Sequence, residues 1–163
     1  GYLENMDADY IQKRLSTFDG VKRRYTVQEV GNNVYVDDYA HHPTAIKYVI
    51  EATRSRYPGK EIVAIFQPDR FSRGLRFAKE FAESMNLADY PFLVHFPENA
   101  KKEAGIDIDI HEIGQYLPRA IVIHEDEDAV KLLAEHDDVV FLFMSSKDIY
   151  KFEDMLIDYK STH

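Results

Sequence analysis

The feature that most constrains the fold of this chain is a regular alternation of helical and strand-like segments from residue 43 onward. Apolar spacing predicts helices at 43–56, 72–86, 108–116, 126–135 and 148–159, with strands between them at 62–66, 92–96, 120–123 and 139–144. Segments 62–66 and 139–144 are apolar at every position, which is typical of strands buried on both faces. Such alternation predicts a mostly parallel sheet with helices on both faces.

The chain before residue 43 has a different pattern. Residues 8–18 have the apolar spacing of a short helix, and alternating residues between 25 and 36 flank a Gly-Asn-Asn turn at 31–33. This pattern predicts an antiparallel β-hairpin. The predicted fold class is therefore α/β: a mostly parallel, Rossmann-like sheet flanked by helices and opening with an antiparallel hairpin.

Composition narrows the possible functions. The formal net charge of −9 over 163 residues disfavours nucleic acid or an anionic membrane as partner. No apolar run approaches the roughly 20 residues of a membrane span, and the first residues lack the layout of a signal peptide. The chain contains no cysteine, which excludes disulfides and thiolate chemistry. We expect a cytoplasmic protein with neither a nucleic-acid nor a membrane partner.

Polar clusters follow three of the predicted strands, at 37–42, 67–73 and 145–148. In parallel sheets, ligands bind at the carboxyl ends of the strands. The first cluster places Asp37, Asp38, His41 and His42 within six residues, ahead of Pro43, which suits a helix start. These groups could ligate a metal, accept hydrogen bonds from sugar hydroxyls, or cap the helix and remain solvated.

The second cluster contains Arg70 and Arg73, which lie three residues apart where a strand leads into a helix. A helix start favours anions, and arginine binds a carboxylate through two parallel hydrogen bonds. The segment therefore predicts a carboxylate site, although a pair of exposed surface arginines is the alternative.

Both clusters resemble the C-terminal domain of Mur ligases. Segment 37–43, Asp-Asp-Tyr-Ala-His-His-Pro, is similar to the strand-to-helix signature that opens that domain. Segment 66–73, Phe-Gln-Pro-Asp-Arg-Phe-Ser-Arg, resembles the motif of the ligases that add L-alanine to UDP-N-acetylmuramate. Segment 20–25 resembles the hinge after their central ATPase domain. The resemblance implies that residues 1–23 are the tail of that domain with the hinge, and that 24–163 form the C-terminal domain.

The resemblance also implies a chemistry, namely ATP-dependent amide formation through an acyl phosphate. It assigns cofactor binding to Arg24, Asp38 and His41, and the catalytic site to Tyr39, His41, Arg70 and Arg73. Substrates would be UDP-N-acetylmuramate and L-alanine, while ATP and Mg²⁺ would be held mainly by the central domain, with no metal site in this chain. Because the sequence has no phosphate-binding P-loop, we expect a fragment that is inactive alone.

Two departures from the family pattern keep other functions open. Asp69 stands where the family has His, and Ser145-Ser146-Lys147 replaces a turn with two glycines. The alternatives are a diverged, non-catalytic nucleotide-binding paralogue, or a metal-dependent hydrolase whose ligands are Asp37, Asp38, His41 and His42.

Overall fold

The computed structural model describes residues 24–68, 76–96, 109–146 and 149–163. The expected helix at 8–18 and the proposed hinge up to residue 23 lie outside these ranges. Within them, no helix is long and apolar enough to cross a membrane.

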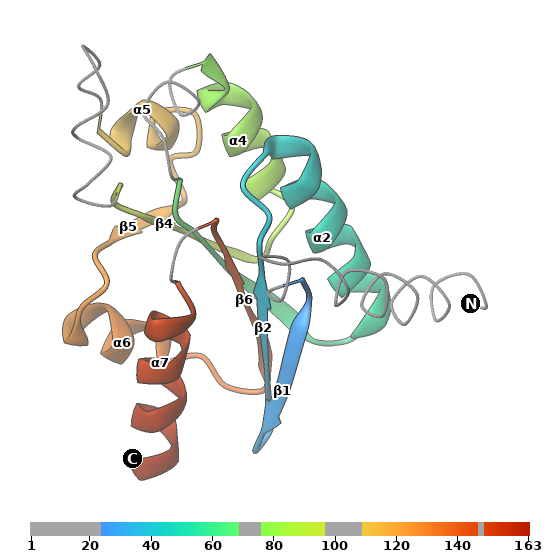
Figure 1. Cartoon of the computed structure of the whole chain (residues 1–163), viewed down its shortest axis with the longest axis vertical. Coiled ribbons are helices and arrows are strands. Elements are labelled where there is room, and N and C mark those ends of the chain that lie inside the picture. Colours follow the sequence, from blue (N-terminus) through green and yellow to red (C-terminus); the bar gives the residue numbers. More distant parts are fainter. Residues whose placement is uncertain (1–23, 69–75, 97–108, 147–148) are drawn as a thin grey trace.

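A six-stranded mixed sheet forms the centre of the fold (Figure 1). Its strands, in spatial order, are β1 (Thr26–Val30), β2 (Asn33–Asp38), β6 (Val139–Met144), β3 (Glu61–Phe66), β4 (Tyr90–Val94) and β5 (Ile121–Ile123). The β1–β2 pair is antiparallel, and every other pair is parallel. The predicted fold class is therefore confirmed, including the opening hairpin.

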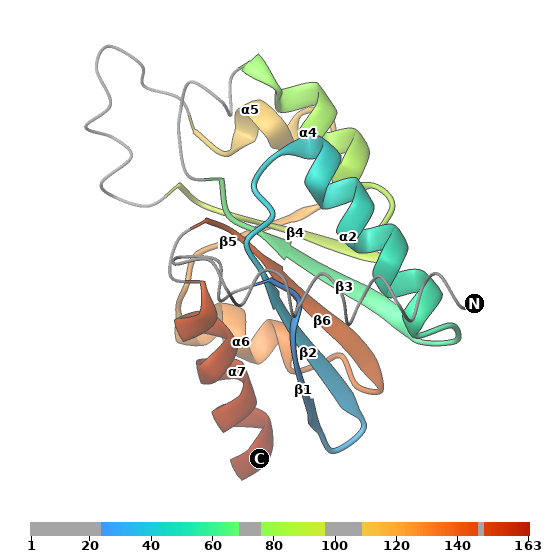
Figure 2. The same ribbon diagram turned by 45° about the vertical axis from the view of Figure 1, so that its right-hand side comes forward.

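Helices cover both faces of this sheet, as Figures 1 and 2 show. One face packs against α2 (Pro43–Arg56), α4 (Ala78–Met85) and α5 (His111–Gly114). The other packs against α6 (Glu127–Leu133) and α7 (Tyr150–Thr162). The two apolar cores thus lie on opposite sides of the strands, as expected for a parallel sheet between helical layers.

Strand β2 shows how the sequence fills both cores. Val34 and Val36 join the core under α2 and α4, whereas Tyr35 joins the core under α6 and α7 and stacks on Phe141 with ring centroids 5.2 Å apart. Successive side chains of a strand point to opposite faces. Burying each large apolar side chain contributes about 1.5–3 kcal/mol, so this double burial stabilises the centre of the sheet.

A tight turn joins β1 to β2. Gly31 has a φ of +62°, in the region that favours glycine, and two-residue hairpin loops require a positive φ at their first central position. Asn33, expected in the turn, is instead the first residue of β2. The side chain of Asn33 is buried and hydrogen-bonded, which explains why this residue belongs to the sheet.

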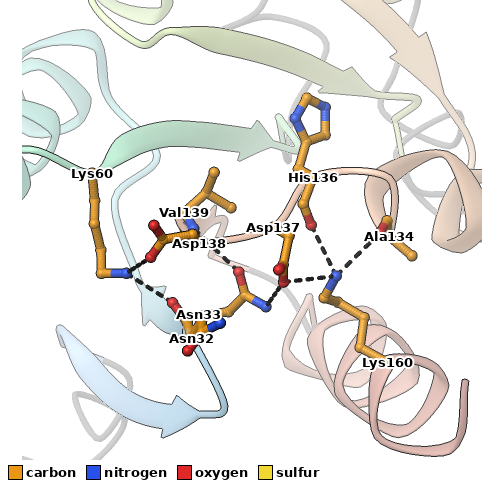
Figure 3. A network of polar contacts seen from close by, with 9 residues as sticks. All are labelled: Asn32, Asn33, Lys60, Ala134, His136, Asp137, Asp138, Val139 and Lys160. Carbon is orange, nitrogen blue, oxygen red and sulfur yellow. Dashed lines mark hydrogen bonds and ion pairs between the residues drawn. The ribbon is translucent and has the colours of Figure 1, made fainter.

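A polar network closes the amino-terminal edge of the parallel strands (Figure 3). Lys160 of α7 donates to the carbonyl oxygens of Ala134 (3.1 Å) and His136 (2.9 Å), which follow α6. Lys60 donates to the Asn32 carbonyl (2.7 Å) and to Asp138 (2.5 Å). The network joins the hairpin turn, the loop before β6 and the closing helix, so its role is structural.

Several element boundaries differ from the predictions. Strand β4 spans Tyr90–Val94 rather than 92–96, since Tyr90 and Pro91 take up the parallel pairing with β3. Pro91 is the second residue of this strand, where the missing N–H removes one donor from the ladder. Helix α7 continues to Thr162, beyond the last apolar residue of its periodic face. Helix α4 begins at Ala78 rather than at 72, although 72–75 lie outside the described residues, and α5 spans His111–Gly114 rather than 108–116. The other described elements match their predicted ranges within about two residues.

Candidate functional site

Polar residues gather at the carboxyl edge of the sheet, where adjacent strands end. The backbone N–H of Ser145 donates to the Asp38 carbonyl (3.2 Å), and the N–H of Gln67 donates to the Met144 carbonyl (3.1 Å). The Gln67 side chain then donates to the His95 carbonyl at 3.0 Å. These bonds connect the ends of β2, β6, β3 and β4, so the described parts of the three predicted clusters lie along one edge.

Asp38 ends β2 and is held from two sides. Its Oδ2 accepts from the N–H of Tyr25 at 2.9 Å, and its Oδ1 accepts from the N–H of Ala40 at 2.8 Å. Only 5% of the residue is exposed. Burial raises the pKa of Asp38, while the two N–H donors and the nearby Arg24 guanidinium oppose that rise. The carboxylate is therefore fixed in orientation and sits beside a cation.

Asp37, the preceding residue of β2, points to the opposite face of the sheet. Strand alternation turns Asp37 toward the side of α6 and α7 and Asp38 toward the side of α2. Both residues are buried. The two adjacent carboxylates therefore point to opposite faces of the sheet and do not share one binding site.

Arg24, Tyr39 and His41 lie close to one another next to Asp38. The guanidinium carbon of Arg24 is 5.9 Å from the centre of the Tyr39 ring, and that ring meets the His41 ring edge-on at 4.9 Å. The Nδ1 of His41 is 2.8 Å from the carbonyl oxygen of Tyr39. A carbonyl can only accept, so Nδ1 carries the proton and Nε2 is the nitrogen that can accept a proton or a hydrogen bond.

His42 has a local structural role. Its Nδ1 accepts from the N–H of Thr44 at 3.4 Å, which makes it the N-cap of α2, and its ring lies 5.1 Å from that of Phe77. Pro43 occupies the first helical turn, as predicted. In the part of the chain that the structure describes, no group of three or more His, Asp or Glu side chains is placed to hold a metal ion. The geometry thus gives no support to the metal-dependent hydrolase.

The predicted carboxylate site falls outside the described residues. Arg70, Arg73 and Asp69 lie in 69–75, and Lys147 lies in 147–148. The arginine pair therefore stays a prediction. Of the predicted site residues, the structure brings together Arg24, Asp38, Tyr39 and His41.

Sequence reasoning missed two features of this edge. Tyr25 was assigned to the hairpin and to the hinge-like segment 20–25 but not to the site, although its N–H donates to Asp38. His95 stacks on His124 with ring centroids 3.8 Å apart and an interplanar angle of 4°, after β4 and β5 respectively. The expected strand at 92–96 placed His95 inside the strand, whereas the observed end at Val94 puts it at the carboxyl edge.

The arrangement is that of an α/β domain with a buried carboxylate, a cation and an aromatic–imidazole pair at the carboxyl edge of its sheet. A family model for the Mur ligase, glutamate ligase domain matches residues 22–146. The chain belongs to this family, as a Mur ligase C-terminal domain.

Solved structures of several ligases share the fold. The UDP-N-acetylmuramate–alanine ligase of Thermotoga maritima matches with a TM-score of 0.67 and 24% identity, over 86% of this chain and 30% of that one. The murein peptide ligase of Psychrobacter arcticus matches at 0.69 and 22%, over 93% and 32%. The MurF ligase of Thermotoga maritima, solved with ADP, matches at 0.64 and 24%, over 86% and 31%. The chain thus spans about a third of the length of these relatives.

Proposed function

We propose that this chain is the amino-acid-binding and nucleotide-closing domain of an ATP-dependent UDP-N-acetylmuramate–L-alanine ligase in peptidoglycan precursor synthesis. The observation that carries the proposal is the grouping of Arg24, Asp38, Tyr39 and His41 at the carboxyl edge of the sheet. Ligands of parallel α/β sheets bind at this edge. A substrate and a nucleotide found in the cytoplasm imply the same location for the enzyme.

The donors and acceptors present fit a nucleotide. Each oxygen of Asp38 accepts one backbone N–H, and a carboxylate oxygen can accept a second donor, such as a ribose hydroxyl. Arg24 supplies a cation beside that carboxylate, suited to the negative charge of the nucleotide. ATP would activate the substrate carboxylate by phosphorylation, with Mg²⁺ held mainly by the central domain.

His41 and Tyr39 would flank the reacting groups. With its Nδ1 bonded to a carbonyl, His41 presents Nε2 as an acceptor, which suits proton removal from an attacking ammonium group. Tyr39 holds the His41 ring edge-on and shields it on one side. Much of the rate gain would come from positioning when the domains close.

The choice of L-alanine rests on segment 66–73. The UDP-N-acetylmuramate–alanine ligase and the murein peptide ligase share the fold although their names give different substrates, so fold alone does not choose the amine. The Phe-Gln-Pro start of this segment and its arginine pair favour the alanine-adding ligases. Arg70 and Arg73 would bind the carboxylate of the amino acid.

The proposal is tested with the full-length enzyme that contains this domain. Phosphate release is measured with UDP-N-acetylmuramate, ATP and Mg²⁺ in the presence of L-alanine, glycine or L-serine. We expect L-alanine to give the highest kcat/KM, and the 163-residue chain alone to give no turnover. Turnover with a muramyl-peptide or a folate substrate, but not with UDP-N-acetylmuramate, would refute the assignment.

A non-catalytic nucleotide-binding paralogue is the second candidate. It is favoured by the replacement of two glycines near Ser145 and Ser146, where Ser145 is fully buried at the end of β6. Side chains at this turn limit how closely a ligand can approach the backbone. Nucleotide binding by the full-length protein without turnover of any amine would support this candidate.

A further inference from the structure

Tyr25 has an unusual backbone conformation directly beside Asp38. Its φ is 51°, a left-handed value that bulky residues rarely adopt. Among the residues that the structure describes, Asp138 is the one other non-glycine residue with a positive φ. Such conformations persist where the surroundings hold them, and they concentrate at functional positions.

The side chain of Tyr25 is anchored to helix α2. Its hydroxyl lies 2.9 Å from Oγ1 of Thr53, a fully buried residue. Thr53 donates its own proton to the carbonyl of Val49 at 2.7 Å, so the Tyr25 hydroxyl is the donor to Thr53. The Arg56 guanidinium carbon lies 5.4 Å from the centre of the Tyr25 ring. These contacts fix Tyr25 against the last turns of α2.

The backbone of Tyr25 reaches the site. Its N–H donates to Oδ2 of Asp38, while the N–H of Ala40, in the turn before α2, donates to Oδ1. The Asp38 carboxylate is thus held between one donor from the strand-to-helix turn and one whose position depends on the Tyr25 anchor. Without the anchor, the Tyr25 N–H can leave, and the carboxylate regains rotational freedom.

We propose that Tyr25 is a positioning residue: its anchor on Thr53 and Arg56 fixes the Asp38 carboxylate in the orientation that binds the nucleotide. The inference rests on the proposed nucleotide role of Asp38. It adds that α2 controls this role from a distance, through a residue that need not touch the nucleotide. Because Arg24 directly precedes Tyr25 in the chain, the anchor of Tyr25 also limits where the Arg24 backbone can lie.

Four substitutions in the full-length enzyme test the anchor by steady-state kinetics. Tyr25→Phe and Thr53→Val each remove the Tyr25–Thr53 hydrogen bond. We expect them to raise the KM for ATP by about three- to tenfold, the equivalent of one neutral hydrogen bond, and to leave the KM for the amino acid within twofold. Thr53→Ser keeps the hydroxyl and should leave the KM for ATP at its wild-type value. Tyr57→Phe is the matched control, because the buried Tyr57 hydroxyl has no hydrogen-bond partner among the described residues.

Amide hydrogen exchange in the 163-residue chain measures the anchor without catalysis. We expect Tyr25→Phe and Thr53→Val to reduce protection of the residue-25 amide by about tenfold, and Tyr57→Phe to leave it unchanged. Unchanged protection in Tyr25→Phe, or an equal rise in the KM for ATP with Tyr57→Phe, would overturn the positioning role.

A parallel Asp38→Asn enzyme separates the two proposals. If its KM for ATP is unchanged, the nucleotide role of Asp38 fails. If that KM rises tenfold while Tyr25→Phe has no effect, the positioning role alone fails.

Discussion

The side-chain oxygen of Asn33, the first residue of β2, accepts the backbone N–H of Val139, the first residue of β6, at 3.2 Å. The Asn33 side-chain nitrogen donates to Asp137 at 2.9 Å (Figure 3). Asn33 is 5% exposed. One buried amide therefore joins the starts of two neighbouring parallel strands that lie more than a hundred residues apart in the sequence.

Removing this amide should destabilise the fold. We expect Asn33→Ala to lower the free energy of unfolding by about 1–3 kcal/mol, because the buried N–H of Val139 loses its acceptor. Asn32→Ala is the matched control: Asn32 is exposed and uses its backbone carbonyl, so the change should stay within about 0.5 kcal/mol. Urea denaturation of the 163-residue chain measures both. Equal losses in the two variants would show that the turn, and not the buried amide, is responsible.

The two aspartates of β2 should differ in function. In the full-length enzyme, Asp38→Ala should reduce ATP affinity or turnover by about tenfold or more, since a charge-assisted hydrogen bond is lost. Asp37→Ala should have the smaller effect, because Asp37 faces the opposite side of the sheet. Kinetics with ATP as the varied substrate decide between them. Equal losses in Asp37→Ala and Asp38→Ala would instead indicate that both carboxylates bind one metal ion.

The arginine pair should determine affinity for the amino acid. We expect Arg73→Ala to raise the KM for the amino acid more than tenfold, and more than the KM for ATP, because removing one partner of a buried Arg–carboxylate contact costs about 2–5 kcal/mol. Asp69→His should lower the KM for the amino acid, since it removes a negative charge next to the site. If Arg73→Ala leaves that KM within twofold of wild type, these arginines do not bind the carboxylate.

Acid should weaken a contact at the start of β3. Asp89 accepts from Arg54 at 2.6 Å and from the N–H of Ile62 at 2.8 Å. Although burial tends to raise the pKa of Asp89, these donors outweigh it and hold the pKa below the usual 3.8. A lowered folded-state pKa stabilises the fold above pH 3.8, and this stability is lost as the pH falls below that value through the folded-state pKa.

Asp89→Asn isolates this contribution. The variant should be less stable than wild type at pH 7, and the difference between the two should shrink as the pH is lowered below 3.8. Because other carboxylates titrate in the same range, the measured quantity is the difference in the free energy of unfolding at each pH. The side chains of Arg54 and Asp89 are partly exposed, so we expect a modest effect. A difference that stays constant from pH 7 to pH 2.5 would contradict the assignment.

Much of the fold follows from local sequence pattern. Apolar runs such as 62–66 and 139–144 identified the central strands, Pro43 marked a helix start, and the glycine at 31 marked the hairpin turn. These features depend on apolar periodicity and on backbone preferences, and both are set by residues that are close together in the sequence. The candidate cluster 37–43 could be recognised for the same reason, because its residues are consecutive.

Strand order and the contacts of the site were decided by tertiary structure. The sequence does not specify that β6, the last strand, inserts between β2 and β3, and this order places Ser145 beside Asp38 and Gln67 beside Met144. Nor does it show that Tyr25 meets both Thr53 and Asp38. Such contacts join residues distant in the chain and form only when the packed cores bring the elements together. The sequence by itself thus determined which residues are available for chemistry, and only the tertiary structure decided which of them share a site.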